Sequence, residues 1–572
     1  MDESTVRDPR KLLPTVAYFS MEIGLDSAIH TYSGGLGILA GDTLRAGADN
    51  VIPMVGVTLL YRKGYFRQEI SADGYQVEHP DTWNPAEHME FYDHKVKIRL
   101  DNRDVWIQAW RYRIHGVTHG ITPVYFLDTD LPENSDYDRT LTDSLYGGDN
   151  YYRLCQEAVL GLGGIAMLRS LGIHRIHPYH MNEGHSALLT LALLEEHMGE
   201  RGLAAATDKD RHAIRQECVF TTHTPVPAGH DQFDMEMTRR VLGAERCAAL
   251  EASGCCVQGN LNMTSLALTF SHYVNGVAMR HGEISRGMFP HYPIDSITNG
   301  VHAVMWTAPP YAELYNKHLP GWKRDNLYLR HALSIPLAEV REAHRRSKEN
   351  LLQEVQRRSG AALDPKVFTI GFARRMTGYK RPDLLLSNPD RLRQIAAHAG
   401  PFQVLYAGKA HPRDESGKAL IHFIHQMSRS LDHQVRIVFI PDYNISLAKL
   451  LVSGVDLWLN TPQKPQEASG TSGMKAALNG VPSLSVLDGW WIEGHLEGVT
   501  GWAIGDGWDG ESSPAEDIEA LYRKLETQIL PLYYQRPEEY DRLMRAAIAH
   551  NGSFFNTQRM MLQYLKNAYY MF

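Results

Sequence analysis

The stretch EASGTSGMKAALNG, residues 467–480, contains a lysine at a position where a cation is not expected. Its letters predict a turn that runs into a helix, with Lys475 in the first helical turn. The exposed amides of a helix start carry partial positive charge, so an ammonium group there is disfavoured by roughly 0.3–1 kcal/mol. A helix start and nearby cations would lower the pKa of the lysine and leave more neutral amine, which attacks aldehydes. We therefore expect Lys475 to do chemistry, although an exposed lysine in a tolerant position would have the same letters.

Four cations, Arg374, Arg375, Lys380 and Arg381, lie in the stretch GFARRMTGYKRPD, directly after a predicted strand. A loop of this kind falls at the carboxyl end of a parallel strand, where open α/β sheets bind their ligands. Such a cluster is unfavourable unless water solvates it or an anion faces it, and the arginine fork matches phosphate. A solvated surface stays open as an interpretation, but the loop position favours an anion site.

The glycine-rich stretch YSGGLGILAGDTLRAGAD, residues 32–49, predicts a turn that feeds a helix. Gly34, Gly35 and Gly37 would let backbone amides approach an anion at the helix start, where no charged side chain is required. The stretch is not the dinucleotide fingerprint GxGxxG. A phosphate site and a simple tight turn both fit these letters.

Histidine-bearing segments supply a further set of polar side chains. They are HMNEGHSALL (His180, Glu183, His185), TTHTPVPAGHD (His223, His230) and TNGVHAVMW (Asn299, His302). A metal site is disfavoured, because the HExxH spacing is missing and no third ligand is evident. Sugar hydroxyls need paired donors and acceptors, which His, Asn and Glu supply, so polar loops that line a sugar pocket fit better.

The elements that must position these residues are short apolar runs that alternate with helical stretches, a pattern typical of parallel βαβ units. The predicted strands lie in TVAYFSMEI, MVGVTLLY, VWIQAWRYRI, TPVYFLDTD, ECVFTTHTPV, KVFTIGFARR, FQVLYAGKA, VRIVFIPDY, VDLWLN and VPSLSVLDG. Residues 366–490 read as one doubly wound domain, whereas polar alternation in the N-terminal half suggests an antiparallel insertion. After the segment 303–335 comes a long helix, with Ser334 as its expected cap and Pro336 near its first position.

The bulk composition is that of an ordinary globular protein. With 572 residues the chain is too long for one core, so two or more domains are expected. A net charge of −8 with scattered Lys and Arg lacks the basic stripe that a nucleic-acid backbone requires. Few cysteines, an N-terminus without a leader pattern and no apolar run near roughly 18 residues predict a cytoplasmic chain without a membrane segment.

Together these segments resemble the α-glucan phosphorylases, the glycogen, starch and maltodextrin phosphorylase family, in its short bacterial and archaeal branch. The motifs that carry the resemblance occur in family order: YFSMEIG, YSGGLG, DGYQVEHPDTW, YYRLCQEAVL, HMNEGHSALL, TTHTPV, SITNGVH, RRMTGYKR and EASGTSGMKAALNG. The resemblance implies an α/β fold of the GT-B type, two Rossmann-like doubly wound domains that face each other across a cleft. It also implies reversible phosphorolysis of an α-1,4-glucan at its non-reducing end, which gives α-D-glucose 1-phosphate with retention.

The resemblance assigns a cofactor to the chain. Lys475 falls on the lysine that binds pyridoxal 5'-phosphate as a Schiff base, and in this family the cofactor works through its phosphate group. Gly35, Gly470, Thr471 and Tyr443 fall on the cofactor-binding positions. No metal is implied.

The resemblance also assigns the substrate side. Arg375 and Lys380 would hold the substrate phosphate, with help from the amides near Gly35 and Gly470. His223 would contact the glucose hydroxymethyl group and offer its main-chain carbonyl to the developing oxocarbenium ion. The other expected substrate-binding residues are Glu22, Glu183, His185, Asn299, Tyr379, Glu467 and Ser469.

The same resemblance implies domain boundaries, and it also shows where this chain differs from the longer members of the family. The expected parts are an N-terminal domain with a β insertion (1–305), a crossover (306–335), a C-terminal domain (336–545) and a helix that packs back on the N-terminal domain (546–572). A homodimer is expected. Glu22 lies only 12 residues before Gly34, so we expect the long N-terminal regulatory segment of the animal enzymes to be missing. Thr377 and Gly378 replace a His-Glu pair of the longer members, which leaves the exact substrate preference open.

Two other functions stay open on the residues alone. A sugar-nucleotide-dependent GT-B glucosyltransferase of the glycogen synthase kind would share the architecture and the basic diphosphate site, but it needs no imine at Lys475. A catalytically silent glucan-binding protein would keep the fold, but the joint presence of Lys475, Arg375 and Lys380 argues against it.

Overall fold

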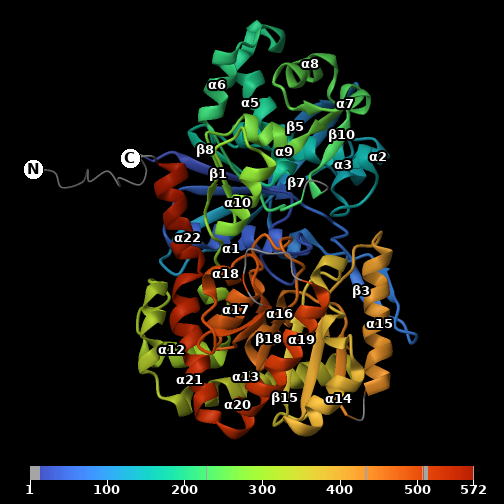
Figure 1. Ribbon diagram of the computed structural model, residues 1–572. Helices are drawn as coiled ribbons and strands as arrows, with labels where there is room; N and C mark the ends of the chain where they lie inside the picture. Colours follow the sequence, from blue (N-terminus) through green and yellow to red (C-terminus); the bar gives the residue numbers. More distant parts are fainter. Residues whose placement is uncertain (1–12, 227–228, 432–433, 506, 508–512, 571–572) are drawn as a thin grey trace, which may run out of the picture.

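Two sheets, one above the other in Figure 1, define an upper N-terminal lobe and a lower C-terminal lobe. The computed structural model describes residues 13–226, 229–431, 434–505, 507 and 513–570. Residues 1–12 lie outside the described part, and they make up most of the N-terminal segment in which no leader pattern was found. Residues 227–228 of the TTHTPVPAGHD segment also lie outside it. Among the described residues, no helix is both long and apolar enough to cross a membrane.

The sheet of the N-terminal lobe has nine strands in the order β14-β13-β9-β8-β1-β2-β7-β6-β5. They are β1 (Thr15–Ser20), β2 (Met54–Leu59), β5 (Glu90–Leu100), β6 (Arg103–His115), β7 (Ile121–Asp128), β8 (Ile176–Asn182), β9 (Cys218–Thr221), β13 (Tyr273–Gly276) and β14 (Asp295–Ser296). Neighbours from β14 to β7 are parallel, whereas β6 pairs antiparallel with both β7 and β5. The predicted antiparallel insertion is therefore confirmed, and it forms one edge of the sheet.

The sheet of the C-terminal lobe has six strands, all parallel, in the order β17-β16-β15-β18-β19-β20. They are β15 (Phe368–Ala373), β16 (Phe402–Ala407), β17 (Arg436–Ile440), β18 (Leu457–Asn460), β19 (Ser483–Val486) and β20 (Gly501–Ile504). Every residue of β15 and of β16 is buried, as expected for a parallel sheet covered on both faces. The α/β class with parallel sheets is confirmed.

Helices pack against both sheets, and two small sheets lie beside them. In the N-terminal lobe and the crossover the helices are α1 (Gly35–Asp49), α2 (Asp136–Arg139), α3 (Asn150–Ala158), α4 (Gly164–Ser170), α5 (Leu189–Met198), α6 (Asp208–Gln216), α7 (Met235–Leu242), α8 (Ala244–Ala252), α9 (Met263–Thr269), α10 (Met279–Met288), α11 (Ala303–Trp306) and α12 (Pro309–His318). After the crossover come α13 (Leu337–Ser359), α14 (Pro389–His398), α15 (Glu415–Leu431), α16 (Ile445–Gly454), α17 (Ser472–Leu478), α18 (Trp491–Gly494), α19 (Pro514–Lys524), α20 (Leu530–Gln535), α21 (Pro537–Ala547) and α22 (Thr557–Tyr564). The small sheets contain β3 (Arg67–Ile70) with β4 (Gln76–His79), and β10 (Gln232–Asp234), β12 (Asn260–Asn262) and β11 (Cys256–Val257).

One central strand was not predicted from the sequence. β8 lies between β1 and β9, yet its sequence IHPYHMN is mostly polar or aromatic, and we expected a loop there. The polar side chains are satisfied inside the lobe: the two ring nitrogens of His180 hydrogen-bond with the Tyr569 hydroxyl at 2.6 Å and with Thr221 Oγ1 at 2.8 Å. A buried strand can therefore carry polar letters when the tertiary structure supplies the partners.

The predicted cap of the long helix is wrong. α13 begins after Pro336, which occupies the N-cap position and has no side chain that could accept a hydrogen bond. Ser334 instead ends a 3-10 segment, Asn326–Ser334, and its hydroxyl donates to the His331 carbonyl at 2.8 Å. The preceding turn uses the hydroxyl that the sequence assigned to the helix.

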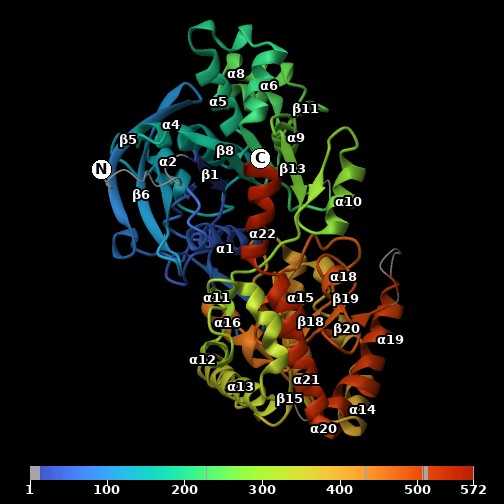
Figure 2. The same cartoon turned by 90° about the vertical axis from the view of Figure 1, so that its left-hand side faces the viewer.

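The end of the chain returns to the N-terminal lobe. α22 follows α21 and runs up beside the nine-stranded sheet, as the red ribbon in Figures 1 and 2 shows. Met560, Met561 and Tyr564 belong to the same buried apolar cluster as Val16 and Tyr18 of β1. This segment therefore joins the lobes, because it leaves the C-terminal lobe and packs into the core of the N-terminal lobe.

A second tie between the lobes is the hairpin of β3 and β4, which docks on the C-terminal lobe beside β16. Gln68 Nε2 donates to the Gly408 carbonyl at 2.9 Å, and Gln76 Nε2 donates to the Ala410 carbonyl at 3.0 Å. Both glutamine side chains are buried. Because a buried amide that loses its partner is costly, these contacts hold the loop after β16 against the N-terminal lobe.

Candidate active site

Lys475 is the fourth residue of α17, between β18 and β19. Its side chain is 8% exposed, and Nζ lies 3.9 Å from the centroid of the Trp306 ring. Among the described residues, no carboxylate or carbonyl oxygen accepts a hydrogen bond from Nζ. Burial lowers the pKa of Lys475 to about 8, while the charge of Asp42 acts to raise it.

The lowered pKa of Lys475 was predicted in direction, but its physical cause differs. We expected a helix start and neighbouring cations to disfavour the ammonium form, whereas burial is the dominant cause. α17 has only seven residues, and Thr471 at its N-cap position makes no side-chain capping bond. The Thr471 hydroxyl is thus not used by the helix.

The four cations after β15 have separate roles. Arg381 is structural, because it donates to the carbonyls of Thr461 and Pro462 at 2.8 Å and pairs with a carboxylate of α19. Arg374 and Lys380 both bind Glu467, each at 2.7 Å. The predicted cationic loop is therefore split between a structural ion pair and a buried cluster around one carboxylate.

Glu467 is the carboxylate at the centre of this cluster. Burial acts to raise its pKa, but Arg374 and Lys380 outweigh burial and lower the pKa to about 2. Its own backbone amide donates to Asp488 Oδ2 at 2.9 Å. Gly470 has φ +81° and lies so close that an added Cβ would come within 3.3 Å of the Glu467 side chain. Glycine is required there by backbone conformation, and the close contact leaves little room for a larger residue.

Arg375 is exposed to solvent, and groups of both lobes act on the pKa of its guanidinium. Burial acts to lower its pKa, and Tyr379 of the same loop together with residues of the N-terminal lobe outweighs burial and raises it. Those N-terminal residues are Tyr146, Glu22 and Tyr65. The guanidinium of a C-terminal loop therefore lies in the electrostatic field of the N-terminal lobe.

Two tyrosines predicted for the site lie beside the cationic loop. Lys380 Nζ lies 4.4 Å from the centroid of the Tyr379 ring. Burial raises the pKa of Tyr443, and the charge of Arg374 opposes that increase, which places Tyr443 close to Arg374. The structure thus brings both tyrosines to the cluster around Glu467.

The glycine-rich turn leads into a helix as predicted, and this helix, α1, begins at Gly35. The amides of Ser33 and Gly34 donate to Glu22 Oε2 at 2.5 and 3.1 Å, and the Tyr146 hydroxyl donates to Glu22 Oε1 at 2.9 Å. A protein carboxylate therefore occupies part of the anion site that the turn was expected to offer. A Cβ added at Gly34 or at Gly35 would meet nothing within 4 Å, so space is open beside the turn.

The predicted residues near β8 and β9 form a second polar group. Glu183 accepts hydrogen bonds from the His223 amide at 2.8 Å and from Thr224 Oγ1 at 3.0 Å. His223 Nε2 lies 2.6 Å from Asn182 Oδ1, and burial lowers the pKa of His223 to about 4. His185 Nε2 lies 3.2 Å from a carboxylate oxygen of Asp231.

His180 lies apart from this group. It points into the core, where burial lowers its pKa to about 3. Within the described residues, no group of three His, Cys, Asp or Glu side chains has the arrangement of a metal site.

Several buried polar atoms at these positions make no hydrogen bond within the described residues. They are Ser469 Oγ, Asn299 Oδ1, Arg374 Nε and Nη1, Thr222 Oγ1 and Asn460 Oδ1. Buried polar groups in folded proteins are nearly always paired, so these atoms are able to hydrogen-bond to a polar ligand. Two of them, Ser469 and Asn299, were predicted to bind substrate.

Sequence reasoning missed residues that support the predicted ones. Arg559 of α22 donates from Nη2 to the Asn299 carbonyl at 2.9 Å, and thus holds the predicted Asn299 loop from the other end of the chain. Asp488 anchors the amide of Glu467, and burial raises the pKa of Asp488 to about 7. Neither residue lies in a motif with a recognisable spacing, so the sequence held no signal for them.

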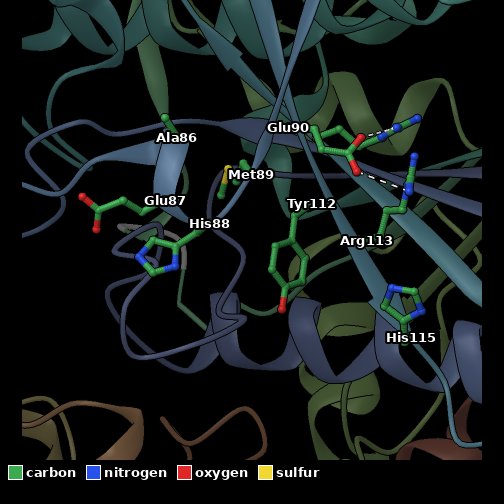
Figure 3. Close-up of a pocket in the computed structure, with 9 residues that line it drawn as sticks. Ala86, Glu87, His88, Met89, Glu90, Tyr112, Arg113 and His115 are labelled. Atoms are coloured by element: carbon green, nitrogen blue, oxygen red, sulfur yellow. Dashed lines mark hydrogen bonds and ion pairs between the residues drawn. The ribbon is translucent and has the colours of Figure 1, made fainter.

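A cavity of about 370 Å³ lies elsewhere, at the outer edge of the nine-stranded sheet (Figure 3). It is lined by residues 86–90 and by Arg111, Tyr112, Arg113 and His115. In Figure 3 the Glu90 carboxylate pairs with the two arginines. None of the predicted site residues lines this cavity.

Comparison with known proteins agrees with the motif resemblance. A profile of the carbohydrate phosphorylase family matches residues 25–105 and 244–499. The chain is 36% identical to a maltodextrin phosphorylase of Thermococcus litoralis, over 97% of this chain and 70% of the relative. It is also 36% identical to the glycogen phosphorylases of Mycobacterium tuberculosis and Aquifex aeolicus, over 97% of this chain and over 71% and 86% of those relatives. The similarity therefore extends over both lobes.

Proposed function

The chain belongs to the carbohydrate phosphorylase family, and from this premise we propose that it is an α-1,4-glucan phosphorylase. The reaction is the reversible transfer of the non-reducing terminal glucose of glycogen or maltodextrin to inorganic phosphate, which yields α-D-glucose 1-phosphate with retention. The observation that carries the proposal is Lys475, a buried amine without an acceptor in the described residues. Fully buried lysines are rare unless they are paired, so an unpaired one indicates a chemical role.

The proposed architecture is GT-B, with the reaction between the lobes. The influence of Glu22, Tyr65 and Tyr146 on the pKa of Arg375 supports this arrangement, because these side chains belong to the lobe opposite Arg375. Open α/β sheets bind ligands beyond the carboxyl ends of their strands, and the Arg375 loop follows β15. The proposed parts are the N-terminal domain 1–305, the crossover 306–335, the C-terminal domain 336–545 and the returning segment 546–572.

Pyridoxal 5'-phosphate is the proposed cofactor, and the residues present fit it. With a pKa of about 8, Lys475 has a neutral amine fraction at physiological pH. The Thr471 hydroxyl is not used in capping, and the space beside Gly35 is open to a phosphate at the start of α1. Gly470 and Tyr443 complete the proposed set. When bound, the cofactor supplies a phosphate group that exchanges a proton with the substrate phosphate.

The substrate phosphate is the proposed ligand of Arg375 and Lys380. Arg375 is exposed and offers its guanidinium fork, whereas Lys380 is held in place by Glu467. Because the pKa of Glu467 is about 2, this carboxylate stays ionised and keeps Arg374 and Lys380 from repelling each other before the anion arrives. Its oxygens also accept hydrogen bonds from sugar hydroxyls in the proposed complex.

His223 is the proposed contact for the glucose hydroxymethyl group. The Asn182 side chain donates from Nδ2 to Ser20 Oγ at 3.0 Å, which turns its Oδ1 toward His223. The neutral ring therefore donates from Nε2–H, and Nδ1 remains an acceptor for a hydroxyl. The main-chain carbonyl of His223 faces the developing positive charge on the sugar in this proposal.

The remaining contacts are proposed to grip sugar hydroxyls on both sides of the scissile bond. They are Asn299, Ser469, Tyr379, Glu22, Glu183 and His185. Buried acceptors and donors without partners, such as Asn299 Oδ1 and Ser469 Oγ, support this assignment. We also propose that the enzyme is a cytoplasmic homodimer that acts on α-glucan, phosphate and glucose 1-phosphate.

The test combines spectroscopy with an assay. Purified protein should show pyridoxal absorbance that Lys475→Ala removes, and it should release glucose 1-phosphate from maltodextrin only when phosphate is added. Lys317→Ala, which changes an exposed lysine, is the matched control and should leave both signals intact. Activity that requires a nucleotide sugar instead would favour a synthase-type transferase, and glucan binding without turnover would favour a silent binding protein.

A further inference from the structure

Three helices from different parts of the molecule contribute the side chains around the Lys475 amine. Asp42 lies in α1 of the N-terminal lobe, Trp306 lies in α11 of the crossover, and Lys475 lies in α17. Lys475 Nζ is 3.9 Å from the centroid of the Trp306 ring, and the indole Nε1–H of the same ring donates to Asp42 Oδ2 at 2.7 Å. All three side chains are buried. The indole ring thus contacts an acid of one lobe and the amine of the other.

Asn479 fixes α11 relative to α17. Its Nδ2 donates to the Trp306 carbonyl at 2.8 Å and to the Lys475 carbonyl at 2.9 Å. Its Oδ1 accepts from the Ala308 amide at 2.7 Å, and the side chain is fully buried. The distance between the indole ring and the lysine backbone is therefore set by a satisfied hydrogen-bond network rather than by packing alone.

We propose that Asp42 and Trp306 are positioning residues for the Lys475 amine. The carboxylate fixes the indole ring through its N–H, and the ring face holds the ammonium group by a cation–π contact. Unlike a carboxylate, a ring face accepts no directed hydrogen bond, so the amine that loses its proton stays free to react. The inference rests on the proposed function in one respect only, namely that the aldehyde with which the Lys475 amine reacts is that of pyridoxal phosphate.

The electrostatic surroundings make Asp42 the relevant acid. The charged or titratable groups around this cluster are Asp26, Asp42, Arg45, Tyr112, Asp49, His302 and Lys449. Arg45 lies 3.6 Å from Asp42 Oδ1, and that oxygen accepts no hydrogen bond within the described residues. Of these groups, Asp42 is the one that acts on the pKa of Lys475, and it opposes burial. It therefore limits how far the pKa of Lys475 falls and keeps part of the amine protonated on the ring.

The experiment measures the amine itself, in protein stripped of pyridoxal phosphate. Competitive labelling with acetic anhydride over a range of pH, read by mass spectrometry of the Lys475 peptide, gives the pKa of that amine without any activity assay. Asp42→Asn keeps an oxygen that can accept from the indole but removes the charge, so the pKa of Lys475 should fall by roughly one unit. Asp138→Asn, at a buried carboxylate that pairs with Arg103, is the matched control and should leave the pKa unchanged.

A second pair of variants tests the ring. Trp306→Leu removes the cation–π face, so the pKa of Lys475 should fall and the dissociation constant for pyridoxal phosphate should rise several-fold. Trp306→Phe keeps a ring face and should restore part of both. If one site does not tolerate substitution, the other decides alone.

An unchanged pKa of Lys475 in the folded Asp42 and Trp306 variants would overturn the proposal. A wild-type protein that labels normally but never binds pyridoxal phosphate would instead refute the proposed function. The labelling result would still decide whether Asp42 and Trp306 position the amine.

Discussion

Two buried lysines of the C-terminal lobe have opposite surroundings. Lys348 of α13 is 3% exposed, and its Nζ donates to Asp456 Oδ2 at 2.6 Å and to the Val367 carbonyl at 2.8 Å. Lys475 of α17 is 8% exposed, and its Nζ lies over an aromatic ring without an acceptor in the described residues. A lysine ammonium group thus donates to two oxygens in one region, and in the other it has no oxygen acceptor among the described residues.

The region around Lys348 is a hydrogen-bond network centred on Asp456. Asp456 also accepts from the Thr369 amide at 2.7 Å and contacts His344 Nε2 at 2.8 Å, so the acid links α13 to β15. A buried ion pair that also hydrogen-bonds to neighbouring backbone groups serves the structure. A buried amine that keeps its lone pair available on deprotonation serves chemistry. The comparison shows that the two lysines share burial and differ in their partners, and the proposed reactivity of Lys475 depends on that difference.

The largest expected effect separates the two lysines by activity. Lys475→Arg keeps a cation but removes the primary amine, so phosphate-dependent release of glucose 1-phosphate should fall by at least about three orders of magnitude. Lys348→Met should retain most of the activity per folded molecule. Similar losses in the two variants would remove the distinction between the regions.

The next effect is on stability. Lys348→Met leaves Asp456 buried without its cation, which should lower the free energy of unfolding by about 3–5 kcal/mol. Urea unfolding of the cofactor-free protein measures the change. Asp456→Asn combined with Lys348→Met should recover part of the loss, because the double variant contains no unpaired charge. A loss below the error of the measurement would show that the network is not structural.

The third effect is an increase in the free energy of unfolding rather than a decrease. The pKa of Lys475 is about 8 in the folded protein against 10.5 for an ordinary lysine, so below pH 8 the protonated amine opposes folding. Between pH 8 and 10.5 the unfolded chain binds more protons than the folded one, and stability rises with pH. Because one pKa unit corresponds to 1.36 kcal/mol, Lys475→Met should stabilise the cofactor-free protein at pH 7 by up to about 3 kcal/mol.

The pH dependence identifies the origin of that gain. The difference between wild type and Lys475→Met should shrink steadily between pH 8 and 10.5 and vanish above pH 10.5, where the amine is neutral in both states. A gain that stays constant with pH would come from apolar burial of methionine, and it would contradict the charge argument.

The smallest effect sets a baseline for both regions. Lys317 is 63% exposed and pairs with Glu339 at 2.7 Å, so its ion pair is screened by water. Lys317→Ala should leave the urea midpoint and the activity within experimental error. A measurable loss there would mean that the values expected for Lys348 need a correction for surface charge.

Much of the fold could be predicted because apolar runs report burial directly. β15 and β16 are buried along their whole length, and most of their residues are apolar, with Thr369 and Gln403 as the polar exceptions. β8 could not be predicted in this way, since His180 is buried only because Thr221 and Tyr569 supply partners from distant parts of the chain. The predicted cap Ser334 was wrong because its hydroxyl bonds to the preceding turn instead of to the helix.

The candidate site was predictable to the extent that local spacing determines it. The sequence placed Lys475 early in a helix and grouped the four cations after a strand. It could not show that Arg381 forms a structural ion pair while Arg374 and Lys380 share Glu467. Those partners lie 80 or more residues away along the chain, and the choice between them depends on how the strands are ordered.

The sequence by itself determined the α/β class, the glycine-rich and cationic loops and the lysine on which the proposed chemistry depends. These features follow from local composition, because periodicity and turn residues act over a few positions. Only the tertiary structure decided which cations are neutralised, why the pKa of Lys475 is lowered and that Trp306 and Asp42 lie beside it. Electrostatic energies depend on distance and burial in space, and neither quantity is encoded in the spacing of letters.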